Sequence, residues 1–273
     1  MKRIYDWNAK FQLRNYTVAD LLNCKGKKIL TQTTANSMEE AAAAKDAELD
    51  LIMGNAINTA AVRQGAPDMF FTAAVPLPDY PTETDVLKAA FSAMKNGADS
   101  IYTARGPHIV EMLAKEEIPV MCHLGLVPRR STWKGGLRAI GRDADEAMTL
   151  LQNFKDMENA GAFSVEAEVI VAEVMTEISK RTSLLTSSLG SGSGGDIIYL
   201  FQNDICGEQL SSPRHAQAFG NIHMLNEEIK KERRRALKAF NDAAKSGSFP
   251  SKKTTTHMQP REYETFLERL EKL

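Results

Sequence analysis

The sequence predicts a single α/β domain with the architecture of a (β/α)8 TIM barrel. Segments typical of strands and of helices alternate from Lys27 to the C-terminal region without a break in composition. They form about seven β/α units, and strands that alternate with helices pair in parallel through right-handed crossovers. Seven or eight such units favour closure into a barrel, although an open doubly wound sheet satisfies the same pattern. We expect one domain over residues 1–273, with the barrel at about 27–225 and a C-terminal helical extension at about 226–273.

Each unit has recognisable boundaries. The first strand, KILTQTT at 28–34, precedes an alanine-rich helix at 37–48, for which Ser37 is the N-cap and acidic residues fill the first turn. A short helix at 58–66 ends at Gly65. The other predicted strands are 49–55, 69–77, 100–106, 119–126, 162–169 and 183–190, and the other predicted helices are 82–98, 108–117, 143–162 and one that runs through Arg181.

The last third of the chain is less regular. SLGSGSGGD at 188–196 predicts a flexible turn, and IIYLF at 197–201 fits either a strand or the start of a buried helix. A charged helix is predicted at 226–247. The final segment, 263–273, is an amphipathic helix whose narrow apolar stripe is typical of docking on the barrel or on a partner subunit.

Composition excludes several classes of function. The net charge is −1, from 34 basic and 35 acidic residues, so the sequence predicts no nucleic-acid partner and no anionic membrane surface. The apolar runs are too short for a membrane span, and the N-terminus lacks the apolar core of a signal peptide. Three widely separated cysteines indicate free thiols. These features together favour a cytoplasmic protein.

Candidate site residues were sought at the C-terminal ends of the strands, where parallel barrels carry their function. Polar residues at these ends are Gln32, Thr33, Thr34, Asn55, Tyr102, Thr103, Arg105, His123, Glu166, Glu168, Ser187 and Ser188.

Glu166 and Glu168 are the most informative pair. Residues two apart share one face of a strand, while Val165 and Ala167 occupy the other face. Two carboxyl groups close together in a site of low dielectric raise the pKa of at least one of them, which suits general acid–base chemistry. The alternative is a structural network in which an arginine, Arg105 or Arg138, pairs with one or both.

His123, Tyr102 and Arg105 also admit two interpretations. His123 follows Cys122 directly, so the two side chains point to opposite faces and do not form a nucleophile pair; Cys122 then packs as a small apolar residue. His123 itself is either catalytic or held by backbone carbonyls. Tyr102 and Arg105 suit recognition of a carboxylate or phosphate, because arginine offers a bidentate fork, or Arg105 forms a surface salt bridge.

Several segments resemble the ketopantoate hydroxymethyltransferase family, in conserved order over roughly residues 17–258. The segments are AAVRQGAPD at 60–68, CHLGLVPR at 122–129, GGLRAIGR at 135–142, DICG at 204–207 and SGSFPSKKTTTHM at 246–258. The resemblance implies a barrel of the phosphoenolpyruvate/pyruvate superfamily that transfers a hydroxymethyl group from 5,10-methylenetetrahydrofolate to a branched 2-oxo acid. It also implies a homo-oligomer, and it places His123 and Glu168 at family positions, with Glu168 at that of the proposed catalytic base.

The departures from the family pattern concern its magnesium site. The positions at which the resemblance implies metal-binding carboxylates hold Asn55, Ala74 and Ala104, and a family lysine is replaced by Tyr102. Magnesium prefers carboxylate ligands, so no magnesium is expected at the family position.

Two functional hypotheses follow. The first is an enzyme of one-carbon or aldol-type chemistry on a small carbonyl or carboxylate compound. In it, Glu168 is the general base, His123 and Glu166 assist, and the substrate contacts Asn55, Tyr102, Arg105, Gln32 and Thr33. The second is a non-catalytic or regulatory barrel. A lyase or hydrolase of the phosphoenolpyruvate mutase/isocitrate lyase superfamily lies between the two.

Overall fold

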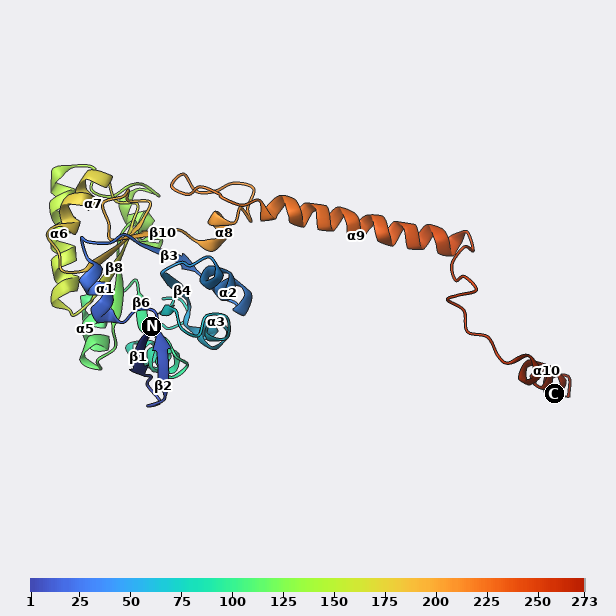
Figure 1. The fold of residues 1–273 in the computed structure, drawn as a ribbon. Coiled ribbons are helices and arrows are strands. Elements are labelled where there is room, and N and C mark those ends of the chain that lie inside the picture. The colour runs from blue at the N-terminus through green and yellow to red at the C-terminus, as the bar shows by residue number, and fades with distance from the viewer. Residues whose placement is uncertain (273) are drawn as a thin grey trace. The chain divides into compact units, whose positions relative to one another are not determined.

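A computed structural model of the chain describes residues 1–272. It contains a closed barrel of eight parallel strands, in the order β10-β3-β4-β5-β6-β7-β8-β9, with helices on the outside (Figure 1). The strands are β3 (Leu30–Thr34), β4 (Leu51–Asn55), β5 (Phe70–Ala74), β6 (Ser100–Thr103), β7 (Val120–Gly125), β8 (Ser164–Glu168), β9 (Leu185–Leu189) and β10 (Ile197–Tyr199). The predicted (β/α)8 barrel is therefore confirmed.

The helices follow the strands in the expected alternation. Those of the barrel are α2 (Met38–Asp46), α3 (Thr59–Gly65), α4 (Glu83–Lys95), α5 (Pro107–Lys115), α6 (Ala144–Asn159), α7 (Ala172–Ser179) and the short α8 (Gln202–Ile205). Two 3-10 turns, η1 (Ala56–Asn58) and η2 (Pro128–Lys134), follow β4 and β7 at the C-terminal rim. Ser37 caps α2 as predicted, because its side chain accepts from the Glu40 backbone N–H at 3.1 Å.

The eighth strand is the segment that periodicity left undecided. Only 197–199 is strand, and it pairs with β3 and β9, which closes the barrel. The connection from β9 contains no helix. Asp196, 4% exposed, anchors its end by accepting from the Thr186 N–H at 2.9 Å and hydroxyl at 2.7 Å, and from the Gly26 N–H at 2.9 Å. These bonds hold a glycine-rich segment in one path without a packed helix.

The N-terminal segment forms structure that the sequence analysis did not assign. β1 (Lys2–Tyr5) and β2 (Phe11–Arg14) form an antiparallel hairpin, and α1 (Val18–Cys24) follows. Thr17 and Asp20 cap α1 reciprocally, a T-x-x-D signature that is readable in the sequence. Arg14 is buried and donates to Asp99 at 2.7 Å, which ties the hairpin to the residue before β6.

The interior of the barrel contains two groups of apolar side chains. An apolar layer at the amino ends comprises Leu30, Leu51, Phe70, Leu185 and Ile197. A second group, Met53, Met121, Leu189 and Tyr199, packs with Tyr102. Cys122 belongs instead to the cluster between strands and helices, so it faces away from His123, as the alternation predicted.

The chain divides into two compact units, of which the second begins at Asn221. It holds α9 (Ile222–Lys245), four residues longer at its start than predicted, and α10 (Pro260–Leu270). Neither helix has a buried residue, and Phe240 of α9 packs edge-to-face with Phe249 at 5.5 Å between ring centroids. Over the described part of the chain, no helix has the length and apolar character needed to cross a membrane.

Candidate active site

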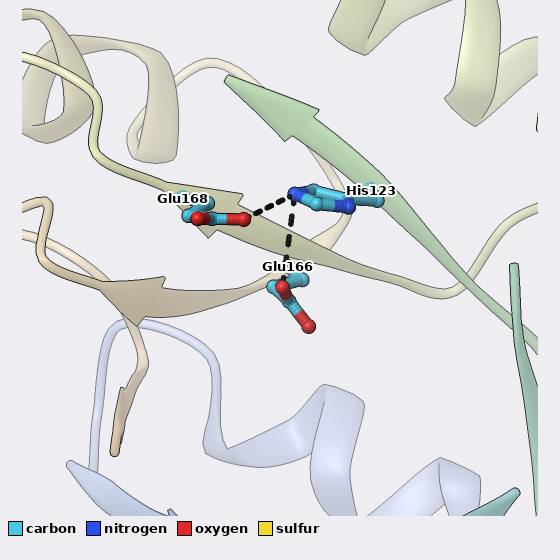
Figure 2. Close-up of side chains that lie close together, drawn as sticks. All are labelled: His123, Glu166 and Glu168. Atoms are coloured by element: carbon cyan, nitrogen blue, oxygen red, sulfur yellow. Dashed lines mark ion pairs between the residues drawn. The ribbon is translucent and has the colours of Figure 1, made fainter. Parts of the chain in front are cut away.

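Two neighbouring strands bring a histidine and two glutamates together inside the barrel. His123 lies opposite Glu166 in the β7–β8 register, and Gly125 lies opposite Glu168. The His123 Nε2 atom is 2.9 Å from Glu168 Oε2 and 3.7 Å from Glu166 Oε1, and Figure 2 shows both carboxylates directed toward the ring. Residues two apart on β8 share the inner face, which is why both glutamates reach the same imidazole.

A tyrosine orients the histidine from its other side. The Tyr102 hydroxyl of β6 is 2.7 Å from His123 Nδ1, and the two rings lie 5.8 Å apart. The His123 Nε2 atom lies close to Glu168, but the two groups are not aligned as a hydrogen bond. Tyr102, His123 and Glu168 therefore form a chain of contacts across three adjacent strands, with Glu166 beneath it.

Burial and charge set the protonation states in this cluster. His123 and Glu166 are 5% and 3% exposed. Burial raises the pKa of Glu166 to about 7, with repulsion from Glu168 adding to the effect and the His123 charge opposing it. Burial lowers the pKa of His123, but attraction from Glu166 and Glu168 more than offsets this, and that pKa lies above its ordinary value. The cluster thus holds exchangeable protons near neutral pH.

Three further polar side chains face the interior beside Glu166. Gln32, Ser187 and Tyr199 are buried, and the Ser187 hydroxyl donates to Gln32 Oε1 at 3.4 Å. Among the described residues, Gln32 Nε2 and the Tyr199 hydroxyl have no hydrogen-bond partner. Buried polar groups are usually satisfied, so these donors indicate that a ligand or ordered water completes the interior. Tyr199 was not identified from the sequence, because the segment that contains it was not assigned to a strand.

Other predicted residues lie elsewhere. Thr33 occupies the face of β3 opposite Gln32, and its hydroxyl donates to the Leu200 carbonyl at 3.0 Å, so the structure does not bring it into the cluster. Arg105 donates to the backbone carbonyls of Leu77 and Tyr80 in the β5–α4 loop. Both bonds come from one terminal nitrogen, and the Arg105 Nε atom is buried without a hydrogen-bond partner among the described residues, so the role of Arg105 in binding a substrate carboxylate stays a prediction.

The alternative interpretation, in which Arg105 or Arg138 pairs with the glutamates, does not match the structure. Arg138 pairs with Glu146 at 2.8 Å. The cation beside Glu166 and Glu168 is His123, which sequence spacing could not place against them. Arg129, in the loop after β7, is a second residue that was not identified from the sequence. The one feature that could have indicated it is a basic residue shortly after the end of a strand.

The family's magnesium position does not fit a magnesium ion in this chain. Asn55 and Ala74 are register partners at the ends of β4 and β5, but a methyl group offers no ligand atom, and Asn55 Oδ1 accepts from the Ile57 N–H at 3.1 Å. His123, Glu166 and Glu168 offer three ligand atoms within 4.8 Å of one another. An imidazole with two carboxylates suits a borderline transition ion better than magnesium.

Comparison with known sequences identifies relatives from one enzyme family. The family model for ketopantoate hydroxymethyltransferase matches residues 15–252. The 3-methyl-2-oxobutanoate hydroxymethyltransferase of Thermotoga maritima is 32% identical over 262 residues, which cover 86% of this chain and 94% of that protein. The enzyme of the same name from Pyrococcus furiosus is 30% identical over 275 residues, covering 92% and 95%.

Solved structures resemble this chain in fold. A 2,3-dimethylmalate lyase, described as a member of the PEP mutase/isocitrate lyase superfamily, aligns with a TM-score of 0.52 at 11% identity, covering 90% of this chain and 93% of that one. A phosphonopyruvate hydrolase in complex with oxalate and Mg²⁺ aligns with a TM-score of 0.51 at 11% identity, covering 93% and 99%. At this identity the likeness concerns the barrel alone.

Proposed function

Because the chain belongs to the ketopantoate hydroxymethyltransferase family, a family of one-carbon transferases, we propose that it forms a carbon–carbon bond beside the carbonyl group of a small oxo acid. The observation that carries this proposal is the contact chain Tyr102–His123–Glu168 at the C-terminal end of the barrel. In the proposed reaction, Glu168 is the general base, and magnesium is not used at the family position.

In this proposal, Glu168 removes a proton from the carbon next to the carbonyl group. It ends β8 and is half-buried, so a substrate at the C-terminal face reaches its carboxylate. A positioned base of this kind contributes about 10²- to 10⁴-fold to the rate. His123 limits the rotation of the carboxylate through the 2.9 Å contact, and Glu166 below it is a second group that can hold a proton.

In this proposal, Tyr102 stabilises the enolate that proton removal creates. When His123 is protonated, its Nδ1–H donates to the Tyr102 oxygen. In this proposal the hydroxyl hydrogen, which also interacts with Glu166, then donates to the oxygen of the substrate. Burial raises the pKa of Tyr102 well above its ordinary value, so the group acts as a hydrogen-bond donor and stays protonated. A preorganised donor at such a position contributes about 3–4 kcal/mol.

The one-carbon donor of this proposal is 5,10-methylenetetrahydrofolate, which supplies an electrophilic carbon when bound. A hollow of about 280 Å³ beside the ends of β3 and β10 contains Phe201, Gln202, Glu40 and Glu208. Its residues fit a pterin: an aromatic ring for stacking, carboxylates for the amino-pyrimidinone edge, and the buried Gln202 Oε1, which has no partner among the described residues.

Deuterium exchange separates the base chemistry from the donor. The protein is incubated with 3-methyl-2-oxobutanoate in D₂O, without folate, and exchange at the carbon next to the carbonyl is followed by NMR. We expect exchange with the wild-type protein and a loss of at least about 100-fold with Glu168→Gln. Wild-type exchange no faster than that of buffer would contradict the proposal for this substrate, and unchanged exchange in the variant would remove Glu168 as the base.

The same assay distinguishes transfer from cleavage. With 5,10-methylenetetrahydrofolate added, a transferase converts the oxo acid to its hydroxymethyl product. A lyase of the same barrel would show exchange without product and would instead cleave a hydroxylated oxo acid. Product formation that depends on Glu168 therefore supports one-carbon transfer, and cleavage alone supports the lyase.

A further inference from the structure

Three arginines lie on the loops that follow β6 and β7, at the C-terminal rim of the barrel. They are Arg105, Arg129 and Arg130. Among the described residues, none of the three forms an ion pair with a carboxylate, in contrast to Arg138 and Arg14, which do. Three like charges at the same rim attract anions toward it, and an anionic substrate is one such ligand.

The arginines differ in where their side chains lie. Arg105 donates to the carbonyls of Leu77 and Tyr80 through one terminal nitrogen, which ties its side chain to the β5–α4 loop. Arg130 lines a hollow that also contains Leu150 and Glu146, on the side of α6. Arg129 alone donates to the carbonyl of Ala104, which directly follows β6 and is two residues after Tyr102.

This hydrogen bond holds Arg129 near the Tyr102 end of the Tyr102–His123–Glu168 contact chain. The positive charge of Arg129 opposes protonation of His123. The pKa of Arg129 is itself lowered, first by burial and then by the charges of Arg130 and Arg105. One of its five N–H groups is used on Ala104, so a bidentate edge remains for a ligand. The half-buried position of Ala104 beneath it presents only a methyl group.

The site is therefore polarised. Its acidic side is β8, with Glu166 and Glu168, and its basic side is the pair of loops after β6 and β7. A carboxylate placed against β8 would meet two glutamates, whereas one placed at Arg129 meets an unpaired guanidinium. The Tyr102–His123 contact lies between the two sides.

We propose that Arg129 binds the carboxylate of the substrate, and that this contact orients an oxo acid with its reacting carbon toward Glu168. The carboxylate contact that the sequence predicts for Arg105 stays a separate prediction. The orientation rests on the proposed function, but the carboxylate site does not require turnover. The substrate class is accordingly a small monocarboxylate with a carbonyl group, and a neutral ketone of the same shape lacks the anchoring group.

Binding of 3-methyl-2-oxobutanoate tests this inference without a one-carbon donor. Its Kd is measured by ligand-observed NMR for the wild type, Arg129→Met, Arg129→Lys and Arg130→Met, all in EDTA. The Arg130 variant is the matched control, because it removes the same charge from the same turn on a side chain that points to another hollow. The neutral ketone 3-methyl-2-butanone is the matched ligand.

Binding of the oxo acid should depend on Arg129 and not on Arg130. Arg129→Met should weaken oxo-acid binding about 10- to 100-fold, the range for a hydrogen bond to a charged group, and Arg129→Lys should weaken it less. Arg130→Met should stay within about threefold, and no variant should change binding of the ketone. Circular dichroism confirms that each variant is folded.

Equal effects of the Arg129 and Arg130 substitutions, or wild-type affinity in Arg129→Met, would overturn the assignment, as would a wild type that does not bind the oxo acid. Glu168→Gln is included because it should bind without exchange. If the oxo acid binds through Arg129 and no protein form catalyses exchange, the proposed function fails while the carboxylate site stands.

Discussion

Replacing Glu166 with glutamine should make the folded protein more stable at neutral and alkaline pH. Glu166 is 3% exposed, and its pKa is about 7 in the folded protein against an ordinary 4.5. An acid whose pKa is raised by folding stabilises the fold fully below about pH 4.5, and this stability is lost as pH rises through about 7. At 1.36 kcal/mol for each unit of pKa, the loss amounts to about 3 kcal/mol.

The measurement is the free energy of unfolding, from urea denaturation at intervals between pH 4 and 9. Glu166→Gln carries no ionisable group at this position, so its curve should coincide with the wild type at the acid end and lie above it by up to about 3 kcal/mol beyond pH 7. Because glutamine has nearly the same shape as protonated glutamate, packing is preserved.

Glu146→Gln is the control of opposite sign. Arg138 holds the pKa of Glu146 at about 2, so that glutamate stabilises the fold above its ordinary pKa and the stability is lost on acidification. Its variant should therefore be less stable than the wild type at neutral pH. A Glu166→Gln curve parallel to the wild type across this range would refute the account of Glu166 as a buried, largely desolvated acid.

Three other predictions concern the site and the barrel. Treatment with EDTA should leave deuterium exchange into the oxo acid unchanged; loss of exchange that a divalent ion restores would show that a metal is required. Tyr102→Phe should slow that exchange about 10²- to 10³-fold through loss of the donor to the enolate, and exchange at the wild-type rate would exclude this role. Asp196→Ala should lower the free energy of unfolding by about 3 kcal/mol, because it leaves Lys25 and two backbone N–H groups without their buried partner; a change below about 1 kcal/mol in urea denaturation would contradict it.

The sequence was sufficient for the local features of this protein. Alternation of strand and helix predicted the barrel, because each amphipathic segment needs the other kind to bury its apolar face. The period of two along a strand placed Glu166 and Glu168 on one face and separated Cys122 from His123, and the structure agrees with both. These features depend only on residues close together in the chain.

Other features depend on which strands become neighbours and on where loops fold back. The contact of His123 with Glu168 joins residues from β7 and β8, and the partner of a buried charge is whatever the register brings beside it. Arg105 contacts the β5–α4 loop and Arg129 the residue after β6, although both arginines follow the end of a strand. The tertiary structure decided these pairings because side-chain contacts across a closed barrel are set by strand order and loop path, and neither is encoded in local periodicity.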